Sequence, residues 1–147
     1  MRKFAIVLVA ASAMAAVPAQ ANETRLEARG GVAWANGAEE AIAGIAGGYD
    51  FDLGESAFIG VEGSADKILV DGTDIVFGTT ARVGAKLGKG KLFATGGYSF
   101  NDGDAWHAGA GYEHLVSDSV YVKVEYRHFF DSFVDVNSAV AGVGMKF

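Results

Sequence analysis

Residues 120–130 read VYVKVEYRHFF, and apolar and ionic side chains alternate along this stretch. Val122 and Val124 fall on one parity, and Lys123 and Glu125 fall on the other. Successive side chains of a β-strand point to opposite faces, so the pattern predicts a strand with one apolar and one ionic face. Such a strand separates an apolar environment from a polar one.

The last eleven residues, 137–147, repeat this alternation and end on an aromatic residue. Ala141, Val143 and Phe147 share one parity, whereas Lys146 lies on the other. The final segment is therefore predicted to be a second amphipathic strand.

The N-terminal segment has the features of a secretory signal peptide. A basic start precedes an apolar run at residues 4–17, and an A-x-A sequence follows from Ala19 to Ala21. The run is shorter than the roughly 20 apolar residues that a membrane-spanning helix needs. We therefore predict a signal peptide at residues 1–21 and a single domain at residues 22–147.

The composition narrows the classes of function. The chain has no cysteine, which excludes thiolate metal sites and a cysteine nucleophile. Its net charge of −6 argues against a nucleic-acid partner, which would require a basic face. The single proline lies in the predicted signal peptide, so no proline would interrupt a β-ladder in the mature chain. A positive mean hydropathy together with this charge favours a protein with apolar surface facing lipid.

The mature chain divides into eight segments that alternate as strands and are separated by turn-rich breaks. An Asn36-Gly37 pair is typical of a two-residue hairpin turn. The segments suit tilted membrane strands of about nine to eleven residues, and bacterial single-chain barrels have an even strand number. We predict an all-β fold, a transmembrane antiparallel eight-stranded up-and-down β-barrel. The predicted strands are 24–34, 41–51, 57–69, 75–87, 91–100, 106–115, 120–130 and 137–147.

Aromatic residues gather near the ends of these strands, as expected at the two interfaces of a membrane. One belt is predicted near the outer rim and the other near the periplasmic rim. The outer belt contains Trp34, Phe77, Phe100, Trp106, Phe129 and Phe130. The periplasmic belt contains Tyr49, Phe51, Phe58, Phe93, Tyr112, Tyr121 and Phe147.

Charged residues in mid-strand are predicted to line the lumen. They are Arg25, Glu27, Arg29, Glu62, Asp66, Arg82, Lys86, Glu113, Lys123, Glu125, Arg127 and Lys146. An eight-stranded barrel is only wide enough for side chains to fill its interior, so an ion-paired plug is favoured over a gated ion path. The set has slightly more cations than anions, which would bias any leak toward anions.

Each of the four predicted outer breaks carries two carboxylates. The pairs are Glu39 and Glu40, Asp71 and Asp74, Asp102 and Asp104, and Asp131 and Asp135. Such pairs could bind Ca²⁺ or Mg²⁺ weakly, although a solvated acidic rim is the simpler interpretation. No break has the spacing of a calcium-binding loop.

The histidines indicate neither a metal centre nor an enzyme. His107, His114 and His128 form no H-x-x-x-H or H-E-x-x-H pattern. None of them has a serine two residues further on, the arrangement found in membrane-embedded lipid A deacylases. We therefore expect no catalytic activity, cofactor or resident metal.

Taken together, these segments resemble the small outer-membrane β-barrels that include the OmpA transmembrane domain, OmpX and the opacity-type surface proteins. The resemblance rests on the signal peptide, the eight strands, residues 121–127 and the closing stretch 140–147. It implies an outer-membrane location, contact with membrane lipids, delivery by periplasmic chaperones, and insertion by machinery that reads Phe147. The absence of a wall-binding domain and the short breaks give no support to wall anchoring or adhesion of the opacity type.

We expect a non-enzymatic barrel with a structural or surface role in the cell envelope. A narrow porin-like channel is one alternative, and a soluble periplasmic barrel that binds an apolar ligand, as lipocalins do, is another. Charged mid-strand residues disfavour the soluble barrel, because they would repel apolar cargo.

Overall fold

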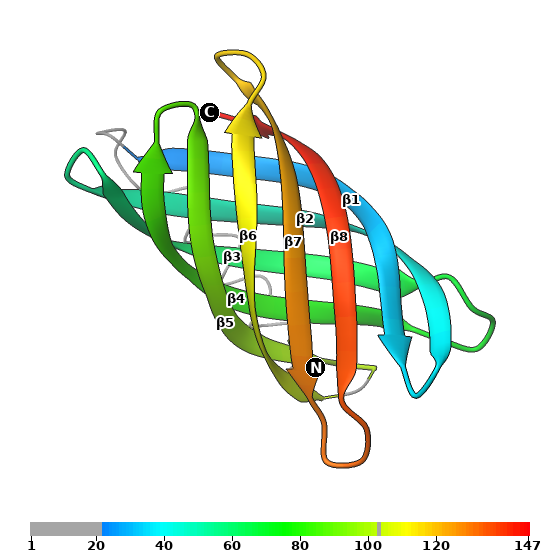
Figure 1. Cartoon of the computed structure of the whole chain (residues 1–147). Coiled ribbons are helices and arrows are strands. Elements are labelled where there is room, and N and C mark those ends of the chain that lie inside the picture. Colours follow the sequence, from blue (N-terminus) through cyan, green and yellow to red (C-terminus); the bar gives the residue numbers. More distant parts are fainter. Residues whose placement is uncertain (1–21, 103) are drawn as a thin grey trace, which may run out of the picture.

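The computed structural model describes residues 22–102 and 104–147, and these form an eight-stranded antiparallel barrel (Figure 1). The predicted signal peptide, residues 1–21, lies outside the described residues. The strands are β1 (Glu23–Ala35), β2 (Ala38–Leu53), β3 (Ala57–Ile68), β4 (Ile75–Leu87), β5 (Gly90–Phe100), β6 (Ala105–Leu115), β7 (Val120–Phe130) and β8 (Val136–Lys146). The predicted fold class and strand number are confirmed.

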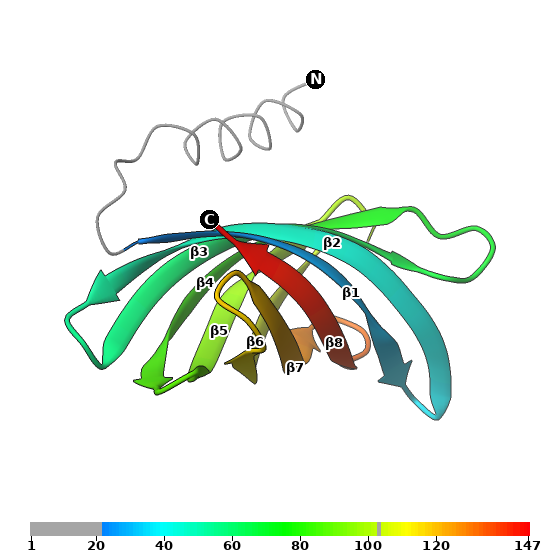
Figure 2. The ribbon, with the colours of Figure 1, turned by 90° about the horizontal axis from the view of Figure 1, so that it is seen from above.

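The sheet is closed by pairing between the first and the last strand. Each strand pairs with its neighbour in sequence, and β8 returns to pair with β1 from Arg25 opposite Lys146 to Trp34 opposite Asn137. The strands at the front of Figure 1 cross those behind, as the tilt of barrel strands requires. Figure 2 shows their curvature and the end of β8 beside the start of β1. Closure removes both sheet edges.

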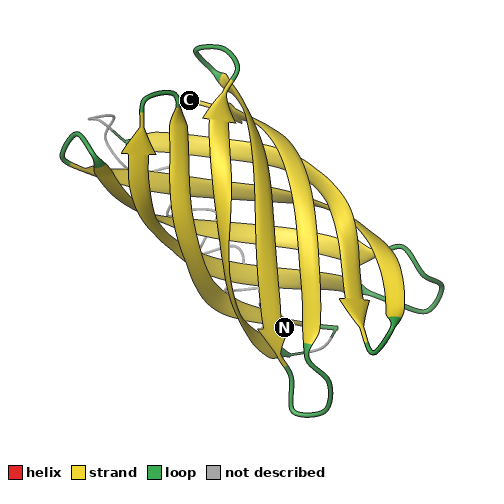
Figure 3. Cartoon of the chain, viewed as in Figure 1, coloured by secondary structure: helices red, strands yellow, loops and turns green. Residues whose placement is uncertain are grey.

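In the part of the chain that the structure describes, loops and turns lie at the two ends of the strands (Figure 3). Residues 22–102 and 104–147 contain no helix that could span a membrane.

Strand β2 begins earlier than the sequence pattern indicated. Asn36 and Gly37 have φ angles of 49° and 81°, the left-handed values that a tight two-residue hairpin turn requires. The turn therefore ends at Gly37, and Glu39 and Glu40 pair with β1 within the ladder. The prediction of a six-residue acidic loop at this position is wrong, because the hairpin needs only two residues.

The outer face of the barrel is apolar. Six outward side chains from six strands are each more than half exposed: Leu26, Ile45, Val83, Leu92, Val124 and Val143. Ile59 and Val61 continue the band on β3. Every strand exposes apolar side chains on the outside, and the interior is polar. This polarity is the reverse of that in a soluble barrel and matches a barrel whose outer face contacts lipid.

Part of the predicted aromatic belts points inward instead. Phe58, Phe93 and Tyr121 are almost fully buried in the lumen, and Phe129 lies inside against His107 with ring centroids 5.4 Å apart. These four assignments to the belts are wrong, because nearness to a rim does not determine which face a side chain takes.

Outward aromatics still pair across neighbouring strands at the rim that carries the β3–β4, β5–β6 and β7–β8 loops. Tyr98 and Trp106 meet edge to face with centroids 5.0 Å apart, and Phe77 stacks on Phe100 at 5.9 Å. Aromatic pairs in this position form an interfacial girdle.

Candidate functional site

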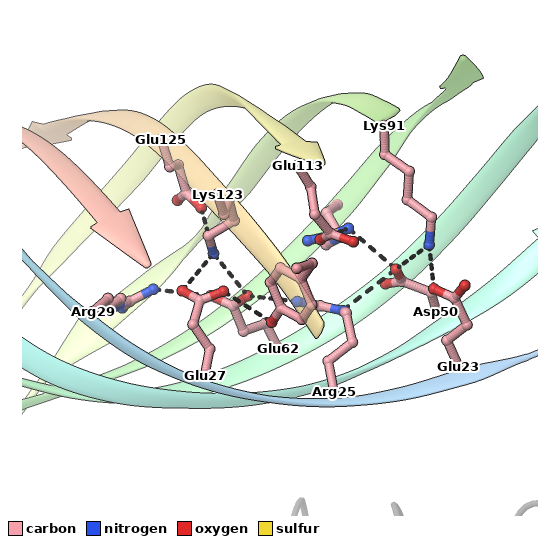
Figure 4. Close-up of polar contacts among 12 residues, drawn as sticks. Glu23, Arg25, Glu27, Arg29, Asp50, Glu62, Lys91, Glu113, Lys123 and Glu125 are labelled. Carbon is pink, nitrogen blue, oxygen red and sulfur yellow. Dashed lines mark hydrogen bonds and ion pairs between the residues drawn. The ribbon is translucent and has the colours of Figure 1, made fainter. Parts of the chain in front are cut away.

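The lumen holds a network of buried ion pairs to which all eight strands contribute. Figure 4 shows part of this network, including Glu62, Asp50 and Lys123. Because side chains alternate along each strand, the charged residues of one parity all point into the lumen. Antiparallel pairing places the charged residues of neighbouring strands at similar depths in the barrel. All twelve predicted lumen residues take part in at least one ion pair. They are Arg25, Glu27, Arg29, Glu62, Asp66, Arg82, Lys86, Glu113, Lys123, Glu125, Arg127 and Lys146.

Glu62 on β3 is the centre of the network. Its carboxylate oxygens lie 2.9 Å from Arg127 Nη2 and 3.2 Å from Arg29 Nη1. They also lie 3.4 Å from Arg25 Nη1 and 3.6 Å from Lys123 Nζ. Only 4% of Glu62 is exposed, and this one buried carboxylate is shared by four cations from β1 and β7. Each of the four also pairs with at least one further carboxylate: Asp50, Asp66, Glu27 or Glu125. Its charge is therefore essential to the balance of this layer.

Asp50 on β2 is a second centre, and the sequence reading missed it. It is fully buried, and its Oδ2 lies 3.1 Å from Arg82 Nη2, 3.2 Å from Lys91 Nζ and 3.3 Å from Arg25 Nε. Its parity opposes Tyr49 and is shared with the small inward residues of β2. Lys91 likewise alternates with an outward residue. Parity alone could have identified both residues.

The charged residues of β7 form ion pairs with one another and with Glu27 of β1. Lys123 Nζ lies 2.9 Å from Glu27 Oε1 and 3.1 Å from Glu125 Oε2, and Arg127 pairs with Glu125. Tyr121 completes this layer by donating its hydroxyl to Glu27 Oε2 at 3.0 Å. The ionic face predicted from residues 120–130 therefore packs against the first strand.

The last strand is joined to the network through Lys146. Its Nζ lies 2.8 Å from Glu113 Oε1 and 3.1 Å from Glu23 Oε2. Gly144, two residues earlier on the same face, leaves room for the ring of Tyr121, because a Cβ at this position would overlap the ring. The small inward residues of β8 therefore make space for the bulky side chains of its neighbours.

The inward aromatics pack against the buried cations. The guanidinium of Arg82 lies 4.3 Å from the ring centroid of Phe93 and 5.0 Å from that of Phe58. A ring face attracts a cation, and the attraction grows when water is excluded. Phe58 and Phe93, which lie near the rim, therefore pack favourably in a charged lumen.

The ion pairs of the lumen are balanced in charge. The basic members are Arg25, Arg29, Arg82, Lys86, Lys91, Lys123, Arg127 and Lys146. The acidic members are Glu23, Glu27, Asp50, Asp52, Glu62, Asp66, Glu113 and Glu125. The predicted surplus of cations is wrong, since Glu23, Asp50 and Asp52 add three anions and Lys91 adds one cation. The predicted bias toward anions loses its basis.

The three histidines occupy three separate environments. His107 is buried in the lumen, with Nε2 2.9 Å from Thr80 Oγ1 and Nδ1 3.1 Å from Ser99 Oγ. His114 lies on the outer face, 3.1 Å from the Tyr112 hydroxyl. His128 is also on the outer face, at the opposite rim.

The acidic loops form no metal centre among the described residues, where no three acidic or histidine side chains converge. Weak binding of Ca²⁺ or Mg²⁺ to these loops stays a prediction. One contact joins two of the loops: the backbone N–H of Asp74 donates to Asp102 Oδ2 at 2.8 Å.

Comparison with known proteins identifies the class of fold. No family model matches the chain, and no curated protein matches its sequence. Among solved structures, the crystal structure of Ail, the attachment invasion locus protein of Yersinia pestis, superposes with a TM-score of 0.63 at 12% identity. The match covers 88% of this chain and 100% of Ail.

Two further structures agree with Ail. Neisserial surface protein A gives a TM-score of 0.59 at 14% identity over 89% of this chain and 100% of its own. The N-terminal β-barrel domain of Pseudomonas aeruginosa OprF gives a TM-score of 0.60 at 14% identity, and the match covers 85% of this chain and 97% of the OprF domain. The chain has the fold of the small eight-stranded outer-membrane β-barrels. The resemblance inferred from the sequence is confirmed at the level of the fold.

Proposed function

We propose that this chain is a non-enzymatic outer-membrane protein with a structural or surface role in the cell envelope, and that its lumen is a closed plug. The observation that carries the proposal is the polarity of the barrel, which is apolar outside and ion-paired inside. A closed sheet of this polarity satisfies its backbone groups in lipid and keeps its charges away from the hydrocarbon. A barrel fold does not define a more specific role.

The proposal includes the route to the membrane. Residues 1–21 would be removed as a signal peptide, and residues 22–147 would form the barrel. The insertion machinery would recognise Phe147, and two observations support this role. Phe147 is 71% exposed and therefore accessible, and its backbone N–H donates to Thr24 O at 2.9 Å, which fixes its position beside β1. The β2–β3, β4–β5 and β6–β7 turns would face the periplasm, as the short turns of bacterial barrels do, and the β1–β2 turn and the β3–β4, β5–β6 and β7–β8 loops would face outward.

Cell fractionation tests this location. We expect the protein in the outer-membrane fraction, with an unboiled band that migrates differently from the boiled band on a denaturing gel, because a closed barrel resists detergent until it is heated. A known periplasmic protein and a known outer-membrane protein serve as fractionation controls. Recovery as a soluble periplasmic protein would support the ligand-binding barrel instead.

The names of structural neighbours and the loops of this chain bear on its role at the cell surface. Two of the structural neighbours are named as an attachment invasion locus protein and a surface protein. The loops of this chain are short, and Phe133 in the β7–β8 loop is almost fully exposed. Short loops favour a structural role over a dedicated adhesive surface.

Planar-bilayer recording tests whether the lumen is closed. We expect no discrete conductance steps, because Glu27, Glu62 and Lys123 meet in mid-lumen and are at most 4% exposed. Separating such pairs to admit a hydrated ion would leave buried charges without partners.

Two controls make the recording informative. Protein-free detergent buffer and a heat-denatured sample of the same preparation detect artefacts and contaminating porins. Steps that appear only with the folded barrel would establish the narrow channel in place of the plug.

A further inference from the structure

The lumen contains a cavity of about 170 Å³ at the end where the β3–β4, β5–β6 and β7–β8 loops lie. We call it the cup. Its walls are largely apolar and include Ala33, Ile42, Val76, Phe129 and Val140. A cavity of about 150 Å³ can hold a benzene molecule, so the cup has room for a ligand the size of a single ring.

The floor of the cup is the outer layer of the ion-pair network. Arg29 and Arg127 line it, and each is already paired with two buried or half-buried carboxylates. Arg29 binds Asp66 through two nitrogens and approaches Glu62, and Arg127 binds Glu62 and Glu125. The floor is therefore poorly suited to an anion, which would have to displace buried carboxylates.

The mouth of the cup is acidic. Asp102 and Asp131 line it, and among the described residues neither has a basic group within ion-pair distance. The side chain of Asp66 is 24% exposed at the floor. The three surrounding loops, residues 69–74, 101–104 and 131–135, contain six aspartates and neither lysine nor arginine. The potential at the mouth therefore favours cations.

Hydroxyl groups give the apolar walls a polar component. Ser138 lines the cup and is only 4% exposed, and no hydrogen bond among the described residues involves its hydroxyl. A buried hydroxyl without a protein partner is suited to bind a ligand or a water molecule. Ser99, which also lines the cup, is already paired with His107.

We propose that the cup binds a small organic cation, an ammonium group carried on an apolar body the size of one ring. The ammonium would lie at the mouth beside Asp102 and Asp131, and the ring would pack against Val76 and Phe129. Each part of the cup contributes one element of selectivity: the acidic mouth selects the charge, the apolar walls bind the ring, and the occupied arginines disfavour anions. This binding activity goes beyond the structural role and does not depend on the membrane in which the barrel resides.

Amide NMR of the refolded barrel in lipid nanodiscs tests the proposal with benzylamine, benzyl alcohol and benzoate. We expect saturable shifts at the amides of Ala33, Val76 and Val140 with benzylamine, and binding about tenfold weaker for the uncharged alcohol. Benzoate should leave these amides unchanged. Outward amides such as that of Val124 report partition of the probe into lipid, which separates that process from binding in the cup.

Three variants complete the test. Asp131→Asn should weaken benzylamine binding about tenfold by removing a charged partner, and Ala33→Phe should abolish binding by filling the cup. Asp135→Asn is the matched control, because it lies in the same loop but does not line the cup. Asp131 is in an exposed loop, so its replacement should leave the barrel folded. Equal binding of all three probes, or native binding by both Asp131→Asn and Ala33→Phe, would overturn the proposal.

Discussion

Replacement of Glu62 by glutamine is expected to lower the free energy of unfolding by about 3–5 kcal/mol, the range found when one partner of a buried ion pair is removed. The substitution keeps the shape of the side chain and removes its charge. Arg25, Arg29, Lys123 and Arg127 would then share one carboxylate fewer in a layer that excludes water. The low dielectric of the lumen makes their mutual repulsion large.

Equilibrium urea unfolding in lipid vesicles measures this effect through the fluorescence of the two tryptophans. Glu55→Gln is the matched control, because Glu55 is an exposed residue in the β2–β3 turn and its replacement should change stability by less than about 0.5 kcal/mol. If the two variants unfold at the same urea concentration, the ion pairs of the lumen do not stabilise the barrel.

Arginine in place of Val124 is expected to destabilise the barrel by about 2–4 kcal/mol in lipid, the range for a basic residue at the bilayer midplane. Val124 lies near the middle of β7, is 58% exposed, and faces outward between Tyr112 and Ala141. Its arginine would have to reach an interface or draw water and headgroups into the hydrocarbon.

Val116→Arg provides a closely matched control for this change. Val116 is also 58% exposed but lies in the β6–β7 turn, outside the hydrocarbon, where we expect a loss of at most about 1 kcal/mol. Urea unfolding in vesicles of the same lipid compares the two variants. Equal stabilities would show that the outer face of β7 does not contact lipid.

Alternation was sufficient to assign most side chains to a face. Lys123, Glu125 and Arg127 were predicted to point inward because they alternate with valine and tyrosine, and a strand offers only two directions. The same rule applies to Asp50, which shares its inward parity with the small residues of β2. Phe58 lies near a rim but shares the inward parity of Glu62, and parity determines the face that its side chain takes.

The start of strand β2 depends on pairing with β1 and not on the local sequence alone. Glu39 and Glu40 look like loop residues because acidic residues are uncommon in strands. The two-residue turn at Asn36-Gly37 allows the hairpin to continue past them, and pairing with β1 places both in the ladder.

The sequence by itself determined the class of fold and the direction of the side chains, because both follow from a period of two and from the number of segments. Tertiary structure alone decided which charges meet. Lys146 reaches Glu23 across the closure of β8 on β1, and Glu62 receives cations from strands it does not pair with. Such contacts depend on the register and stagger of the closed barrel, and a one-residue shift in register would exchange the two faces of a strand.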